Sequence, residues 1–195
     1  MTVETKIAIG IGSALTLGFL AFKLFSNKRS KIVSLAKKEY KHWGNGSILE
    51  GDSRTIKQLR NYWTSAGAGD WSDSKMIREP WSAAFITYIY KKSNVKNFKG
   101  SVAHINYIEE AKKNKKGIKF YKPYNAFLKK GDLACYKREG GSHCDVVVDI
   151  SKNEAKVIGG NVSQSVSMRT IKLTNDGRID DTREKLPYIA VLKPN

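Results

Sequence analysis

Apolar positions recur with a helical period in the first half of this chain and fall into short extended runs in the second half. The helical period predicts helices over about residues 30–43, 53–66, 80–92 and 102–114, with Asp52 or Ser53 capping the second and Ser101 the fourth. Short runs separated by glycine or asparagine predict strands over residues 133–136, 144–150, 156–158, 166–173 and 188–192. Helices followed by strands predict an α+β fold, with N-terminal helices packed on a small antiparallel sheet of five to six strands.

An apolar run near the N-terminus differs from this amphipathic pattern. Residues 7–25 carry one charge, Lys23, and nearly reach the ~20 residues that span a bilayer. A cleaved signal peptide is the alternative, although no clear small-x-small cleavage site follows. We therefore expect a single transmembrane helix that fixes the chain in a lipid bilayer. Small residues four apart, Gly10, Ala14 and Gly18, would let two such helices approach in a homo-oligomer.

The domain organisation that follows has three parts. Residues 1–29 form the anchor, residues 30–51 a basic linker helix and residues 52–195 one globular domain. The cations after the apolar run favour a cytoplasmic body by the positive-inside rule, which leaves the orientation in the membrane open.

The formal net charge of +17 indicates a polyanionic partner. Nucleic acid, anionic lipid and anionic cell-wall polymers are the candidates. The lysines are scattered, and neither an arginine-rich motif nor an aromatic RNA-binding signature accompanies them. A scattered charge suits a general field better than a surface that reads bases, so a nucleic-acid partner is not expected.

Two cysteines, Cys135 and Cys144, flank the first predicted hairpin. With a two-residue turn at Glu139-Gly140 they face each other and can be bridged, whereas a turn one residue later separates them. Buried free thiols are the alternative. The chain offers too few further ligands for a metal pattern, so neither a metal nor a cofactor is expected.

Candidate chemistry begins at Ser82, in the first turn of the helix opened by Pro80. Unpaired N–H groups and the helix dipole favour negative charge there, so Ser82 is either an ordinary first-turn serine or a nucleophile. His143 begins the second strand and can act as a general base if a hydroxyl meets it. Asn161, at the end of the next strand, or Asp145, two residues along the same face, can orient its imidazole.

The other candidates have structural alternatives. His104 lies on a predicted helix, where a satisfied structural histidine is the favoured interpretation over an accessory role. His42 is expected to be solvated. Trp81, with Tyr62 and Trp63, either forms a groove wall or packs in the core.

Four motifs occur in a recognisable order: Trp81-Ser82-Ala83-Ala84-Phe85, Gly131-Asp132-Leu133, Ser142-His143 and Ile158-Gly159-Gly160-Asn161. This order resembles the CHAP (cysteine, histidine-dependent amidohydrolase/peptidase) and NlpC-like hydrolases, which have papain-like folds. It looks closest to a CHAP-like family of bacterial and phage proteins with Trp-Ser-Ala-Ala-Phe and His-Cys-Asp signatures. The resemblance covers about residues 53–192.

The resemblance implies a catalytic set. Ser82 falls where the superfamily has its nucleophilic cysteine, His143 matches the base, and Asn161 matches the orienting residue. A serine cannot be ionised in advance as a cysteine thiolate is, so its proton must leave during attack.

The implied function is cleavage of amide bonds in peptidoglycan by a membrane-anchored amidase or endopeptidase. Such a protein would lie in a bacterial cell envelope or in the membrane of a phage particle, where it would serve host lysis or entry. The alternative is a catalytically inactive domain that binds cell wall or has a structural role in a phage particle.

Overall fold

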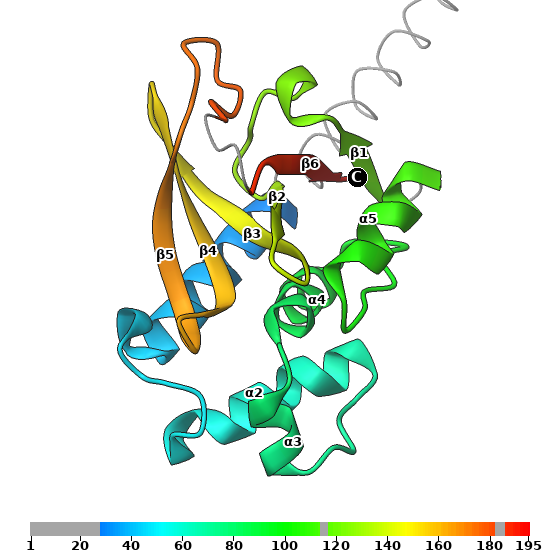
Figure 1. Cartoon of the computed structure of the whole chain (residues 1–195), viewed down its shortest axis with the longest axis vertical. Helices are drawn as coiled ribbons and strands as arrows, with labels where there is room; N and C mark the ends of the chain where they lie inside the picture. The colour runs from blue at the N-terminus through cyan, green and yellow to red at the C-terminus, as the bar shows by residue number, and fades with distance from the viewer. Residues whose placement is uncertain (1–27, 114–116, 182–185) are drawn as a thin grey trace, which may run out of the picture.

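Helices from the first half of the chain pack against a six-stranded antiparallel sheet formed by the second half (Figure 1). The computed structural model describes residues 28–113, 117–181 and 186–195. A helix covers residues 28–42, and the later helical elements are η1 (Gly44–Gly46), α2 (Ser53–Ala66), α3 (Asp73–Arg78), α4 (Ser82–Lys92), α5 (His104–Lys113) and η2 (Pro123–Asn125). The strands are β1 (Ile118–Tyr121), β2 (Leu133–Arg138), β3 (Gly141–Ile150), β4 (Glu154–Val162), β5 (Ser165–Lys172) and β6 (Tyr188–Pro194).

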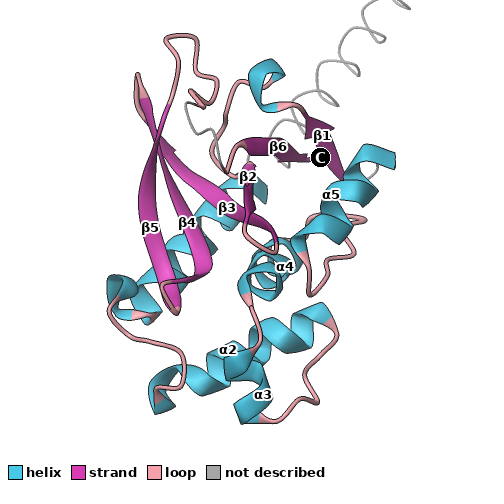
Figure 2. Cartoon of the chain, viewed as in Figure 1, coloured by secondary structure: helices cyan, strands magenta, loops and turns pink. Residues whose placement is uncertain are grey.

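The sheet has the order β1-β6-β2-β3-β4-β5, so the last strand lies between β1 and β2 (Figure 2). Alternation along the strands divides its apolar side chains between two cores. The larger core joins the sheet to the helices and includes Leu133, Cys135, Cys144, Val146, Ile158 and Leu192. The smaller core, on the other face, includes Ala134, Val147, Val157 and Val191.

The central helix α4 contacts α2, β3 and β4. Eight of its residues are buried, from Ser82 to Tyr90. Trp81 occupies the N-cap position, so Pro80 precedes the helix instead of opening its first turn. Ser82 is therefore the first residue of α4, where its backbone N–H has no partner within the helix.

Among the α-helices and strands, two elements were not predicted from the sequence. The six-residue helix α3 occupies part of the expected loop between α2 and α4, and its first turn is capped by Ser72. The edge strand β1 pairs with β6, with Ile118 opposite Pro194. Both elements are too short to show a clear period.

The strand β4 continues through Gly159-Gly160, although these glycines were expected to lie between two strands. A Cβ atom on Gly160 would lie 2.5 Å from Phe85 Cβ, and one on Gly159 would overlap the Asp145 carboxylate. The two glycines thus allow β4 to lie close to α4 on one side and to Asp145 on the other.

The expected transmembrane helix requires a correction. Among residues 28–113, 117–181 and 186–195, no helix is long and apolar enough to cross a membrane. Residues 7–25, on which the prediction depends, lie outside the described residues. Over the described residues the fold class is an α+β domain without a membrane-spanning helix, which corrects the expected fold class and the expected single-pass membrane protein.

The segment expected to be a linker helix packs into the body of the domain. Ile32, Ala36 and Trp43 have no exposed surface and belong to the larger core. Arg29 Nη1 lies 2.7 Å from Asp132 Oδ1, directly before β2. This ion pair and the buried apolar face make the helix over residues 28–42 part of the same packing unit.

Cys135 and Cys144 lie opposite each other in the β2–β3 ladder and form a disulfide. Arg138 pairs with Gly141, which leaves Glu139-Gly140 as the two-residue turn that the bridged alternative requires. No described cysteine is free.

Removing this disulfide with a Cys135→Ala/Cys144→Ala double variant is expected to lower the free energy of unfolding by about 2–3 kcal/mol, since it frees a short loop in the unfolded chain. Urea unfolding of the two proteins under non-reducing conditions measures the difference. Reductant should move the wild-type midpoint toward that of the variant. Equal midpoints for the two proteins without reductant would contradict a formed bridge.

Candidate functional site

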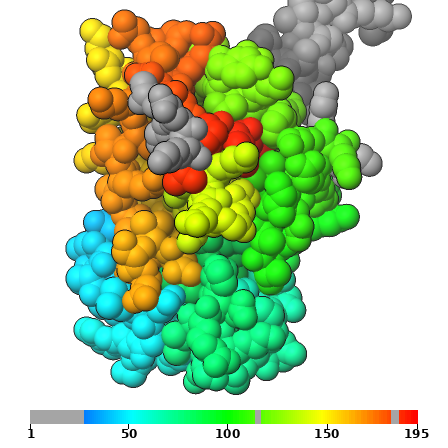
Figure 3. All heavy atoms as spheres, in the orientation of Figure 1, coloured from blue at the N-terminus to red at the C-terminus, as the bar shows by residue number. Residues whose placement is uncertain are grey.

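Ser82 lines a pocket of about 540 Å³ at the N-terminal end of α4. The pocket lies between the segment that precedes α4, the start of α5 and the β2–β3 turn, which stands at the surface beside α5 (Figure 3). Its walls include Trp63, Trp71, Glu79, Ser82, Val102, His104, Ile105, Lys137, Arg138, Glu139 and Ser142. Only 3% of Ser82 is exposed, so its hydroxyl is nearly shielded from water.

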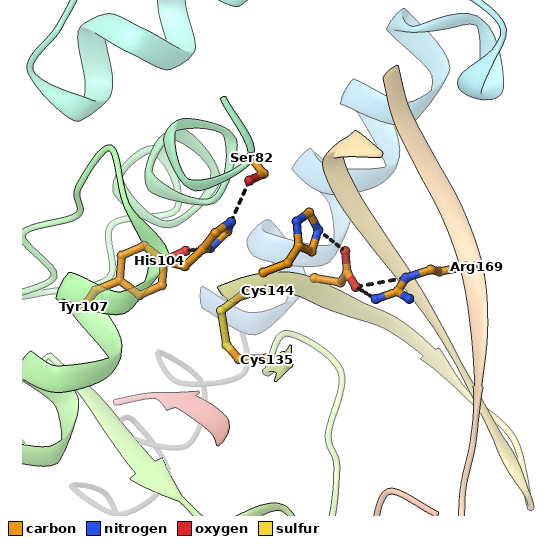
Figure 4. The surroundings of a disulfide bond; sticks show 8 residues. Ser82, His104, Tyr107, Cys135, Cys144 and Arg169 are labelled. Carbon is orange, nitrogen blue, oxygen red and sulfur yellow. Dashed lines mark hydrogen bonds and ion pairs between the residues drawn. A yellow bond between two sulfur atoms is a disulfide. The ribbon is translucent and has the colours of Figure 1, made fainter. Parts of the chain in front are cut away.

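The hydroxyl of Ser82 bonds to a histidine of α5. Ser82 Oγ lies 2.8 Å from His104 Nε2, and the Tyr107 hydroxyl contacts His104 Nδ1 on the other side of the ring (Figure 4). His104 is thus buried and satisfied, as a structural histidine would be, yet one of its partners is the candidate nucleophile. His104 and Tyr107 are three residues apart and share one face of α5.

Burial determines how His104 is protonated. Desolvation, together with the charge of His143, lowers the pKa of His104 well below its ordinary value, so the ring is neutral at neutral pH. Burial raises the pKa of the Tyr107 hydroxyl, which therefore keeps its proton. A phenol is a stronger donor than the aliphatic hydroxyl of Ser82 at the other ring nitrogen, so we assign Tyr107 as the donor to Nδ1. His104 then carries its proton on Nε2 and donates to Ser82 Oγ.

A second network holds His143. His143 Nε2 lies 2.9 Å from Asp145 Oδ1. Asp145 Oδ2 accepts from Arg169 Nε at 3.1 Å and also from Arg169 Nη2. Arg169 lies over the ring of Tyr136, 4.4 Å from its centroid. The carboxylate of β3 is thus held between its own strand and β5.

The ionised carboxylate of Asp145 determines how the His143 ring uses its Nε2 atom. Burial alone would raise the pKa of Asp145, but the charges and hydrogen bonds of His143 and Arg169 outweigh it and lower the pKa to about 2. An ionised carboxylate only accepts, so Nε2 of His143 donates to it, and in the uncharged form of the ring the lone pair lies on Nδ1. His143 Nδ1 is buried and has no hydrogen-bond partner among the described residues.

The two networks lie side by side. The ring centroids of His104 and His143 are 5.1 Å apart. Within the described part of the chain, no hydrogen bond joins Ser82 to His143. His104 therefore donates a hydrogen bond to Ser82 Oγ, and Nδ1 of the neighbouring His143 ring is left without a partner among the described residues.

Asn161 does not orient His143 in this structure. It lies near the end of β4 in the left-handed region, with a φ of 53°, where the register between β4 and β5 shifts. Asp145 occupies the orienting position because alternation along β3 puts it on the same face as His143.

Trp81 does not form a groove wall. It has no exposed surface, and its ring stacks 4.8 Å from Trp43 and 5.7 Å from Tyr62. Its indole N–H donates to Glu50. The aromatic side chains that line the pocket are Trp63, which was a predicted candidate, and Trp71, which was not predicted. Among the described residues, no three His, Cys, Asp or Glu side chains are placed to hold a metal ion.

One protein-family model matches most of this chain. A family described as "Uncharacterized protein conserved in bacteria (DUF2272)" matches residues 48–193. The chain belongs to this family. The DUF2272 match runs from before α2 into β6 and contains both histidine networks. No curated protein and no solved structure matches the chain. The likeness to CHAP and NlpC-like hydrolases thus depends on the four motifs alone.

The buried neutral His104 should make stability depend on pH. Its pKa is lower in the folded than in the unfolded chain, so its stabilising effect is complete above the ordinary value of 6.5 and is lost as the pH falls. Between pH 6.5 and 5.5 the free energy of unfolding should fall with a slope approaching about 1.4 kcal/mol per pH unit. Urea unfolding of the wild type and of His104→Gln measures this slope.

The control is His42→Gln, which changes an exposed histidine. Burial raises the pKa of Glu39, so this residue makes the free energy of unfolding rise as the pH falls. The wild type and His104→Gln both keep Glu39, so the difference between their slopes reports His104. A slope that His104→Gln leaves unchanged would contradict the neutral buried ring.

Proposed function

We propose that this chain is a serine-dependent hydrolase of amide bonds in peptidoglycan. The observation that carries the proposal is the position of Ser82, at the start of a buried helix and in a pocket. Its partner His104 lies 5.1 Å, between ring centroids, from His143, which a buried carboxylate orients. Hydroxyl, imidazole and carboxylate are the three groups of a serine hydrolase.

In the proposed mechanism, rotation of the Ser82 side chain moves its hydroxyl from His104 to Nδ1 of His143. Ser82 Oγ attacks the amide carbonyl carbon, and its proton passes to His143 Nδ1. The tetrahedral intermediate collapses as His143 returns the proton to the leaving nitrogen, which departs as an amine. Water then hydrolyses the acyl-serine by the same route in reverse. Asp145 remains ionised and stabilises the imidazolium.

The oxyanion of the intermediate would be stabilised at the start of α4. The first hydrogen bond closed there runs from Phe85 N to Trp81 O, so the N–H groups of Ser82, Ala83 and Ala84 have no partner within the helix. Backbone donors and the helix dipole favour a developing negative charge at this end. His104 Nε2–H is a further donor beside Ser82 Oγ.

Peptidoglycan is proposed as the substrate because of the four motifs and the charge. Residues of both signs, Glu79, Lys137 and Glu139, line the pocket together with apolar Trp71 and Ile105. Such a lining suits a short peptide that carries both amine and carboxylate groups. The net charge of +17 favours the approach to an anionic wall.

The test is digestion of purified peptidoglycan by the full-length protein, with release of new amino groups as the readout. Wild type and Ser142→Ala, which changes another serine of the pocket, should both release amino groups. Ser82→Ala should fall to the level of a reaction without protein. Mass spectrometry of the fragments identifies the bond.

Equal release by Ser82→Ala would exclude Ser82 as the nucleophile. Retained binding of peptidoglycan without release by the wild type would instead support an inactive binding domain. In that case Ser82→Cys tests the rest of the machinery, because a thiol is the stronger nucleophile.

A further inference from the structure

A second hollow, a groove of about 1080 Å³, shares no lining residue with the Ser82 pocket. One wall is a face of the helix over residues 28–42, and the other is the segment of residues 128–130 that leads into β2. Arg29 holds the two walls together, because its guanidinium bonds to Lys130 O at 2.9 Å and to Asp132 Oδ1 at 2.7 Å. The groove is therefore formed by packed elements at both sides.

Cations line both walls of this groove. Lys37, Lys38 and Lys41 are exposed on the helix, and Lys129 and Lys130 are exposed on the facing segment. No acidic residue is among the described residues that line it. Asp149 lies near, 3.2 Å from Lys130, and offsets one of these charges. The remaining lysines give the groove a positive field that suits a phosphate.

The rest of the lining is apolar. Val33 and Ile150 are half-buried, and Leu128 is 7% exposed. A nucleic acid or a wall polymer would engage the lysines and leave this apolar surface uncovered. An occupant with an anionic head and a hydrocarbon chain would cover both, and burial of its CH₂ groups against the apolar lining would add to the affinity.

We propose that this groove binds a single amphiphilic phosphate, a lipid with a phosphate head and an alkyl chain. The phosphate lies among the lysines, and the alkyl chain lies along Val33, Leu128 and Ile150. Neither the groove nor its chemistry involves Ser82, so the proposal does not depend on hydrolysis at that site.

Isothermal titration of the full chain tests the proposal with decyl phosphate below its micelle concentration. We expect one molecule per chain, bound at least tenfold more tightly than inorganic phosphate or decyl maltoside. A Lys37→Gln/Lys38→Gln/Lys41→Gln variant should bind decyl phosphate at least tenfold more weakly. Val33→Gln should weaken decyl phosphate and leave the weak binding of inorganic phosphate unchanged.

The matched control removes three exposed lysines elsewhere, Lys92, Lys96 and Lys152, in the same way. An equal loss of affinity in this control would reduce the effect to net charge and overturn the proposal. Equal affinity for inorganic phosphate or for the maltoside would also overturn it. So would binding of many molecules per chain, or binding to anionic vesicles or DNA without binding of the single amphiphile.

Discussion

Replacing His143 with alanine is expected to lower kcat/KM for peptidoglycan by about a thousandfold. The residue supplies the only buried ring nitrogen without a hydrogen-bond partner within the described part of the chain, and general-base catalysis contributes on the order of 10²–10⁴ in rate. Without the imidazole, the Ser82 proton has no acceptor during attack. Initial rates of amino-group release over a range of substrate concentrations give the comparison.

The matched control is His104→Gln. A glutamine amide can still donate to Ser82 Oγ, so this variant should lose about tenfold in kcat/KM, far less than His143→Ala. The reverse order of effects would assign the base to His104 and would require its opposite tautomer, in which Nδ1–H donates to the Tyr107 hydroxyl. Comparable secondary structure and unfolding midpoints in the two variants ensure that the rates report chemistry.

Asp145→Ala is expected to lower the free energy of unfolding by about 3 kcal/mol. The substitution leaves the Nε2–H of buried His143 and the half-buried Arg169 guanidinium without their shared carboxylate, and breaking a buried ion pair from one side costs about that much. Urea unfolding at pH 7 measures the loss.

Asp149→Ala provides the matched control, since its pairing with Lys130 is exposed on both sides and should contribute far less to stability. The double variant Asp145→Ala/Arg169→Ala should be more stable than the sum of its single variants implies, because it leaves no unpaired guanidinium. The network around Asp145 would be contradicted if the losses of unfolding free energy were strictly additive. It would also be contradicted if Asp145→Ala and Asp149→Ala lost equal amounts.

The long elements of the fold follow from local patterns. The helices α2 and α4 have apolar faces repeated over several turns, and α2 begins at a residue whose side chain caps it. The elements α3 and β1 lack such signals. The pairing of β1 with β6 joins segments about 70 residues apart, which local periodicity does not contain.

The candidate site was predictable where a residue begins an element. Ser82 is the first residue of α4 and His143 is the third residue of β3, and these positions near the element starts identify them as candidates. The choice between Asp145 and Asn161 depends on strand register and on the backbone of β4. The bond between Ser82 and His104 depends on how α5 packs beside α4, which the sequence does not specify.

Cys144 is the immediate neighbour of His143, and its bridge to Cys135 spans only nine positions. Short loops close with a small entropic cost, so the two thiols can meet before distant segments find each other. Oxidative folding would then covalently close the hairpin that carries the histidine before α4 brings Ser82 to it. Recombinant production in an oxidising compartment should therefore raise the yield of correctly folded protein.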